Sequence, residues 1–158
     1  LQVPASQVGL EGSTLNGMAL SQYDGRATWD YAGKSSAALT NPPPDSGGGG
    51  TNTNSSGGSL SNVLSWVDDR LPIGARTATD GGDAWSWVLS NPPAFHGTLA
   101  NQSTIAPGLH QHYFTGASAS LSLSPGDVLF AYVYLDPAHL PSDVMLQWSD
   151  GSFEHRAY

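Results

Sequence analysis

The sequence predicts an all-β protein, an antiparallel β-sandwich of the jelly-roll kind. Three observations support this fold class. Apolar and polar residues alternate with a period of two in several short runs, as in Ser118–Leu123. Turn-forming residues recur roughly every 8 to 12 positions, which is the spacing of all-β sandwiches. No window of about eleven residues between these turns keeps the apolar stripe of an amphipathic helix.

The N-terminal part of the chain predicts two strands, Leu15–Tyr23 and Ala27–Tyr31. Asp24-Gly25 separates them and is a strong signal for a tight β-hairpin. An isolated two-stranded hairpin is only marginally stable in water, so its apolar face needs a partner surface. We therefore expect this hairpin to dock onto the sandwich formed by the rest of the chain, either in the same molecule or in a neighbouring one.

The C-terminal part supplies the remaining strands. Val128–Leu135 is apolar at nearly every position, which predicts a central strand covered on both faces. Val144–Trp148 and Phe153–Ala157 flank a Ser-Asp-Gly-Ser turn, and we expect them to pair with each other. The other predicted strands are Leu64–Asp69, Trp85–Leu89 and Ser118–Leu123.

Residues 41–59 separate the two parts and contain only Asn, Pro, Asp, Ser, Gly and Thr. Such a segment cannot bury apolar area to offset the entropy of ordering its backbone, so we expect a linker or a long exposed loop. The predicted organisation is a strand hairpin over 1–40, a linker over 41–59 and the main part of the sandwich over 60–158.

The chain is acidic and carries few charges. Thirteen Asp and Glu face five Lys and Arg, which gives a net charge of −8. Nucleic acid is not expected as a partner, because phosphate binding needs clustered Lys and Arg, and no run of about 18 apolar residues is present for membrane insertion. There is no cysteine for disulfides or thiolate metal sites. This composition, rich in Gly, Ser, Thr and Asn, is typical of an extracellular or cell-surface bacterial domain.

Five motifs follow one another between Trp66 and Tyr158: WVDDRLPIGA, GGDAWSWV, HQHYFTGA, GDVLFAYVYLDP and VMLQWSDGSFEHRAY. Together they resemble a domain of large secreted bacterial proteins, including some Rhs-repeat proteins. The resemblance implies a sandwich like those of carbohydrate-binding modules and concanavalin-like domains. Residues 1–34 resemble the C-terminal end of the same domain, although they stand first in this chain. The chain is then either the tail of one domain joined to the front of the next, or one domain in permuted order.

Histidine and aspartate are the residues that could hold a metal ion. His110 and His112 lie two positions apart and would share one face of a strand, as in cupin metal sites, but no carboxylate follows them at the cupin spacing. We therefore expect them to be hydrogen-bonded within the sandwich or along a polar groove. Asp80 and Asp83 could supply oxygen ligands to a structural Ca²⁺, and the alternative is a solvated turn.

The sequence carries no recognisable catalytic motif. A glycosidase needs two carboxyl groups across a cleft, yet Glu11 and Glu154 are the only glutamates and several aspartates stand at turn-like positions. No nucleophile elbow, phosphate loop or zinc-protease motif occurs. We therefore expect a domain that is not an enzyme.

Aromatic residues suggest a place for a sugar, because aromatic rings can stack on the C–H face of a pyranose. Two tryptophans share one face of a predicted strand, with an acid and a histidine nearby to hold hydroxyls. The expected platform consists of Trp85, Trp87, Asp83, His112 and Trp148. The alternative is that the two strand tryptophans fill the core.

These observations predict a non-catalytic module that binds a glycan or adheres to a polysaccharide. The alternative is a structural subunit of an extracellular fibre, in which neighbouring copies donate strands to cover unpaired sheet edges.

Overall fold

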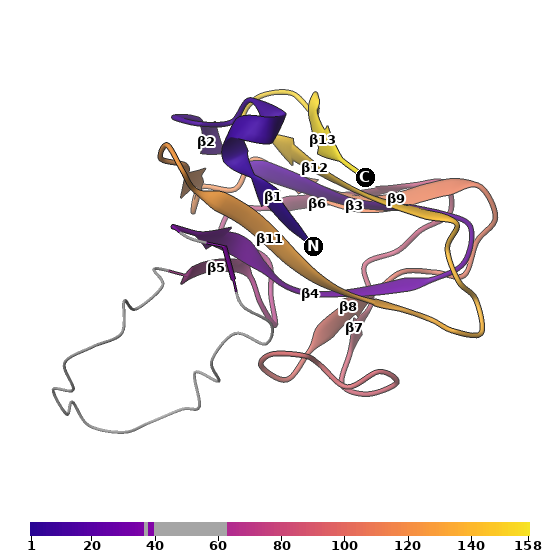
Figure 1. Ribbon diagram of the computed structural model, residues 1–158. Coiled ribbons are helices and arrows are strands. Elements are labelled where there is room, and N and C mark those ends of the chain that lie inside the picture. The colour runs from indigo at the N-terminus through magenta and orange to yellow at the C-terminus, as the bar shows by residue number, and fades with distance from the viewer. Residues whose placement is uncertain (37, 40–62) are drawn as a thin grey trace, which may run out of the picture.

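Two facing sheets make up the structure (Figure 1). This computed structural model describes residues 1–36, 38–39 and 63–158, so the predicted linker over 41–59 lies outside the described residues. All strand pairings of the described residues are antiparallel. Their one helical element is a short 3₁₀ turn, Ala5–Val8. The predicted fold class, an all-β antiparallel sandwich, is confirmed.

The first sheet has its two long strands, β4 and β11, side by side. Its order is β1, β11, β4, β8 and β7, and β5 also pairs with β4. These strands are β1 Gln2–Pro4, β4 Ala27–Ser35, β5 Val63–Val67, β7 Trp87–Val88, β8 Ala100–Gln102 and β11 Val128–Leu135. Strand β4 therefore has partners along both of its edges.

The second sheet has β3 at its centre. Its order is β13, β12, β3, β9 and β6, and a separate small ladder joins β2 to β10. These strands are β2 Thr14–Leu15, β3 Gly17–Tyr23, β6 Arg76–Asp80, β9 Leu109–Thr115, β10 Leu121–Ser122, β12 Asp143–Ser149 and β13 His155–Ala157.

The predicted hairpin between the first two long strands is wrong. Strands form there, as β3 and β4, but they lie in opposite sheets, and Asp24-Gly25 joins them across the sandwich. The turn bonds to other connections: Asp24 Oδ1 accepts from Gly108 N at 2.6 Å, and Arg26 N donates to His139 O at 2.8 Å. Nearly every residue of β3 and β4 is buried. A hairpin covered on one face cannot bury both strands so completely, whereas the centres of two different sheets can.

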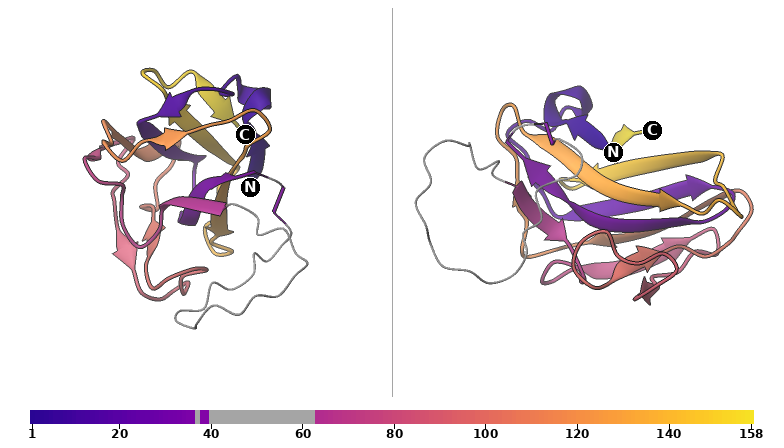
Figure 2. Two further views of the ribbon diagram at one scale, coloured as in Figure 1. Left: turned by 90° about the vertical axis from the view of Figure 1, so that its left-hand side faces the viewer. Right: turned by 60° about the horizontal axis from the view of Figure 1, so that its bottom comes forward.

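Residues 1–35 therefore complete the sandwich within the same molecule. Strand β3 pairs with β12 on one edge and with β9 on the other, and β4 pairs with β11, β5 and β8. Leu1 and Tyr158, the two ends of the chain, lie close together in both views of Figure 2. Of the two docking modes expected for the N-terminal segment, the structure contains the one within a single chain.

The remaining strands follow the predictions in part. Strand β11 has the predicted bounds, and β12 pairs with β13 as expected. Strand β7 is only Trp87–Val88, because the residues around it form turns rather than ladder. The expectation that β11 is covered on both faces fails at its C-terminal end, where Tyr134 is 47% exposed. The candidate site lies at this uncovered end.

The core fills the space between the two sheets. Inward-facing side chains of β3, β9 and β12 meet those of β4 and β11. The largest fully buried apolar side chains are Trp148, Phe114, Phe130, Leu10, Leu15, Met18, Leu121, Leu129 and Leu146. A smaller cluster lies on the outer face of the first sheet and is formed by Tyr31, Leu39 and Phe130, with Val63 and Tyr132 packed against it.

Candidate functional site

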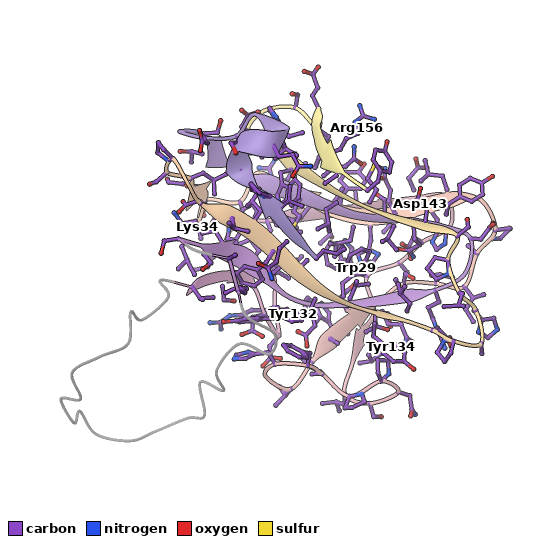
Figure 3. All side chains as sticks on the ribbon, viewed as in Figure 1. Trp29, Lys34, Tyr132, Tyr134, Asp143 and Arg156 are labelled. Carbon is purple, nitrogen blue, oxygen red and sulfur yellow. The ribbon has the colours of Figure 1, made fainter. Side chains whose placement is uncertain are left out.

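A groove of about 490 Å³ lies on the outer face of the first sheet, the face turned away from the second sheet. Strands β4, β8 and β11 form its floor, and the loop between β7 and β8 forms its wall. Figure 3 labels Tyr132 and Tyr134 on this side of the sheet, close to that loop. We call this hollow the aromatic groove; its side chains used below are Thr28, Asp30, Pro92, Phe95, Tyr132 and Tyr134.

The floor of the aromatic groove follows from the period of two in β11. Leu129, Ala131 and Val133 pack toward the core, so Tyr132 and Tyr134 face outward. Across the ladder, Tyr134 pairs with Thr28, and Thr28 pairs with Gln102 of β8. An aromatic ring, a hydroxyl and an amide thus lie in one row across three strands, whose spacing is about 4.8 Å each.

A β-bulge in β4 shapes the neighbouring part of the floor. The register with β11 shifts by one residue between Phe130 and Tyr132, and Tyr31 has a φ of +42°. A bulge re-aims the side chains beside it. Here Asp30 lines the groove while Tyr31 packs against Phe130 and Tyr132 on the same outer face.

The wall of the groove is the segment from Asn91 to Phe95. It starts with a cis peptide bond between Asn91 and Pro92. The ring of Phe95 stacks on Tyr132 with centroids 4.0 Å apart and planes inclined by 12°. Phe95 is 49% exposed and Tyr134 is 47% exposed, so both side chains are accessible to a ligand from the groove.

Asp30 is the acidic group of the groove and is only 8% exposed. Its Oδ2 accepts from Phe95 N at 2.6 Å and from His96 N at 3.0 Å, and its Oδ1 accepts from Tyr31 N at 2.8 Å. Burial raises the pKa of Asp30, and the charge of Asp68 acts in the same direction, against these three N–H groups. The Asp30 carboxylate therefore anchors the wall, although its burial disfavours the ionised form.

Two further aspartates, Asp68 and Asp69, bind the part of the loop that follows Phe95. Asp69 accepts hydrogen bonds from the backbone N–H groups of Thr98 and Leu99 at 2.7 and 2.6 Å. His96 Nδ1 lies 3.0 Å from Asp68 Oδ2, and its ring stacks on Tyr31 at 4.2 Å. Asp30 thus fixes the wall to β4 at Phe95, and Asp68 and Asp69 hold the residues that follow it, which favours a preformed groove.

Gln102 and Thr28 form the polar end of the row. Gln102 Nε2 donates to Thr28 Oγ1 at 3.1 Å and to Asn91 O at 2.9 Å. Both amide hydrogens are used, so the Thr28 hydroxyl is left to donate its proton elsewhere. These contacts fix the orientation of both side chains, of which Thr28 lines the groove.

The predicted sugar platform is brought together only in part. Asp83 Oδ2 accepts from His112 Nδ1 at 2.8 Å, and the ring of Trp85 contacts His112 with centroids 4.6 Å apart. Trp87 stacks beside Trp85 at 6.3 Å, and both tryptophans are partly buried and packed against the core. The alternative expectation is that the two tryptophans fill the core. It holds in part, because both pack against the core without being fully buried.

Two members of the predicted platform have to be corrected. His112 is completely buried and Trp148 is 1% exposed, because β9 and β12 turn these residues toward the space between the sheets. Neither side chain is open to a ligand in this structure. Asp83, at 6% exposed, is also an interior group.

Asp80 and Asp83, the predicted Ca²⁺ ligands, have different surroundings. Asp80 is exposed, and its Oδ1 accepts from Gly81 N at 2.8 Å. Asp83 Oδ1 accepts from the N–H groups of Ala84 and Thr104, both at 2.8 Å. In the part of the chain that the structure describes, no three His, Asp or Glu side chains are grouped as a metal site.

The buried histidines are hydrogen-bonded, as expected. Besides the His112–Asp83 pair, His110 Nδ1 lies 3.2 Å from Nε2 of Gln22. The amide oxygen of Gln22 accepts a hydrogen bond from Trp29 Nε1 at 3.4 Å. Burial alone would raise the pKa of Asp83, but the hydrogen bond and charge of His112, with two backbone N–H groups, lower it. We call this group the inner polar cluster: Gln22, Asp83, His110 and His112.

Sequence reasoning missed the aromatic groove. Tyr132 and Tyr134 have the same two-residue spacing as Trp85 and Trp87, which was the available signal. The other half of the groove comes from Phe95 and Asp30, and only the tertiary fold brings them to β11.

None of the described residues form a helix long and apolar enough to cross a lipid bilayer. Comparison of the chain with protein-family models, with curated proteins and with solved structures gave no match.

Proposed function

We propose that this sandwich is a non-catalytic, extracellular glycan-binding module and that the aromatic groove is its binding site. The observation that carries the proposal is the floor of the groove, where Tyr134 pairs with Thr28 beside the half-exposed side chain of Phe95. Flat rings next to fixed polar groups are the combination that an amphipathic pyranose ring needs.

A sugar ring would lie with its C–H face on Tyr134 or Phe95. Its hydroxyls would then meet the Thr28 hydroxyl and the Asp30 carboxylate, the two polar side chains of the groove beside its tyrosines. Three strands span roughly 10 Å at the spacing of a β-sheet, which is enough for a pyranose and part of a neighbouring unit. The preformed wall supports affinity because little ordering is needed on binding.

The single carboxyl group among the described residues that line the groove supports binding rather than hydrolysis. Glycoside hydrolysis uses a pair of carboxyl groups on either side of the bond that is cut. Among the described residues that line the groove, Asp30 is the one carboxyl group, and it is occupied by three backbone N–H groups.

The experiment is a glycan array followed by titration calorimetry on the best ligand. Tyr134→Ala should weaken binding by about 1 to 3 kcal/mol, the loss of a hot-spot contact. Tyr23→Ala is the matched control, since Tyr23 is 49% exposed but ends β3 in the other sheet, and it should leave affinity unchanged. An array without a ligand, or equal loss in both variants, would contradict the proposal.

The same titration separates the groove from the predicted tryptophan platform. If Trp87→Ala removes binding while Tyr134→Ala does not, the glycan sits at the edge formed by β7 rather than on the aromatic groove.

A further inference from the structure

Asp30 differs from the other buried acids of the described chain. Four aspartates are at most 8% exposed, and three of them have a basic partner. Asp127 lies 2.7 Å from Lys34, Asp136 pairs with Arg26, and Asp83 pairs with His112. Among the described residues, no Lys, Arg or His side chain reaches ion-pair distance of Asp30. Buried charges are ordinarily paired, so this carboxylate is an exception.

Among the described residues, backbone N–H groups bind the Asp30 carboxylate, but no basic side chain pairs with it. His96 binds Asp30 through its backbone N–H, whereas its ring nitrogen Nδ1 lies 3.0 Å from a second acid, Asp68. Asp68 itself adds negative charge at the site and raises the pKa of Asp30 together with burial. The other titratable side chains that the described residues bring to this face are phenols: those of Tyr31 and Tyr132, whose pKa values are raised by burial, and that of Tyr134. The region therefore has an excess of negative charge.

The rings of the groove also favour a cation. A positive group near the face of an aromatic ring is attracted by the ring's electrons. Phe95, Tyr132 and Tyr134 surround the same hollow as the Asp30 carboxylate. Carboxylate and rings together attract an alkylammonium group.

We propose that the ligand of the aromatic groove is a glycan bearing protonated amino groups, such as a chain of non-acetylated 2-amino sugars, and that its ammonium group pairs with Asp30. This inference rests on the proposed function and adds the class of glycan. The pyranose ring stacks on Tyr134 or Phe95, while the ammonium group is the positively charged partner of the Asp30 carboxylate. Acidic polysaccharides are disfavoured because the carboxylate would repel them.

The test compares three β-linked oligosaccharides of the same length and linkage, built from glucosamine, N-acetylglucosamine or glucose. Titration calorimetry is done at low salt and at a pH where the amines are protonated. The glucosamine oligomer should bind at least about tenfold more tightly than the other two, the contribution of one charge-assisted hydrogen bond. This preference should shrink as salt is added.

Two variants locate the charge. Asp30→Asn removes it from the groove and should abolish the preference for the amine. Since this change also alters the acceptor of the Phe95 and His96 backbone N–H groups, Asp68→Asn is the second variant. It removes a neighbouring charge, keeps every lining residue and leaves an amide oxygen facing His96, and it should reduce the preference severalfold. Asp143→Asn, on β12 of the other sheet, is the control and should have no effect.

The outcomes separate this inference from the proposed function. Equal binding of the three oligosaccharides would overturn the ammonium assignment and leave glycan binding intact. A preference that survives both Asp30→Asn and Asp68→Asn would also overturn it. Binding of an oligolysine peptide as tight as that of the glucosamine oligomer would overturn the assignment to a sugar. If no glycan binds at all, the proposed function fails as well.

Discussion

The aromatic groove and the inner polar cluster each contain a buried aspartate that lies beside aromatic rings, but the two aspartates have different partners. In the inner polar cluster Asp83 has a histidine partner, and His112 is completely buried. In the groove, Asp30 has only backbone N–H partners among the described residues, and Phe95 and Tyr134 are half exposed. The pKa of Asp83 is lowered and that of Asp30 is raised. The comparison teaches that residue types alone do not separate a core from a binding site, whereas pairing and exposure do.

Removing residues 1–35 is expected to have the largest effect, because both regions depend on them. The deletion takes away β3, which carries Gln22, and β4, which carries Asp30. Each sheet then loses a strand with partners on both edges, so no cooperative unfolding transition should remain. Circular dichroism and calorimetric melting would check this. A truncated chain that stays folded and monomeric would show that these strands are dispensable.

Asp83→Ala should destabilise the protein by about 3 to 5 kcal/mol, the cost of breaking a buried pair from one side. His112 would remain buried without its acceptor, and the N–H groups of Ala84 and Thr104 would lose theirs. Denaturant unfolding measures the change. Asp80→Ala, at an exposed neighbouring position, is the control and should cost less than about 0.5 kcal/mol. Equal effects would mean that the inner polar cluster adds nothing.

The two aspartates should give opposite pH dependences of stability. The pKa of Asp83 is lowered in the folded state, so its contribution is present above the ordinary value of 3.8 and is lost as the pH falls below it. The pKa of Asp30 is raised, so its contribution is present below 3.8 and is lost as the pH rises through the raised value.

These two pH dependences are tested by measuring the free energy of unfolding across pH for the wild type, Asp83→Asn and Asp30→Asn. The advantage of the wild type over Asp83→Asn should shrink toward acid. Its stability relative to Asp30→Asn should increase as the pH is lowered from neutral toward 3.8. Slopes of the same sign for both variants would remove the electrostatic difference between the two regions.

The smallest effect on stability is expected for Tyr134→Ala, within about 0.5 kcal/mol, because a surface side chain away from the core is replaced. The same variant serves in the binding test, so its thermal melting curve is also a control there. A loss of several kcal/mol would assign Tyr134 to the structural core and not to a ligand surface.

The sequence was sufficient for the fold class and for most strands, since alternation and turn residues are local signals. It failed at Asp24-Gly25, where a hairpin signal marks a crossing between sheets, because strand partners are chosen by burial along the whole chain. For the site, Trp85, Asp83 and His112 do lie together, yet their burial was invisible to local pattern. Asp30 carries no motif at all. Its environment is created by the bulge at Tyr31 and by the loop residue Phe95, which follows Asp30 by 65 positions in the chain.

The crossing at Asp24-Gly25 also has a consequence for how the chain folds. Strands β3 and β4 do not pair with each other: β3 needs β9 and β12, and β4 needs β8 and β11 besides β5, so both depend on strands made much later. Arg26, in the same turn, pairs with Asp136, 110 positions away. High contact order of this kind slows folding and leaves apolar strands exposed meanwhile. During synthesis the N-terminal strands would emerge well before β11 and β12, so this domain is expected to depend on chaperones or on slow post-translational collapse.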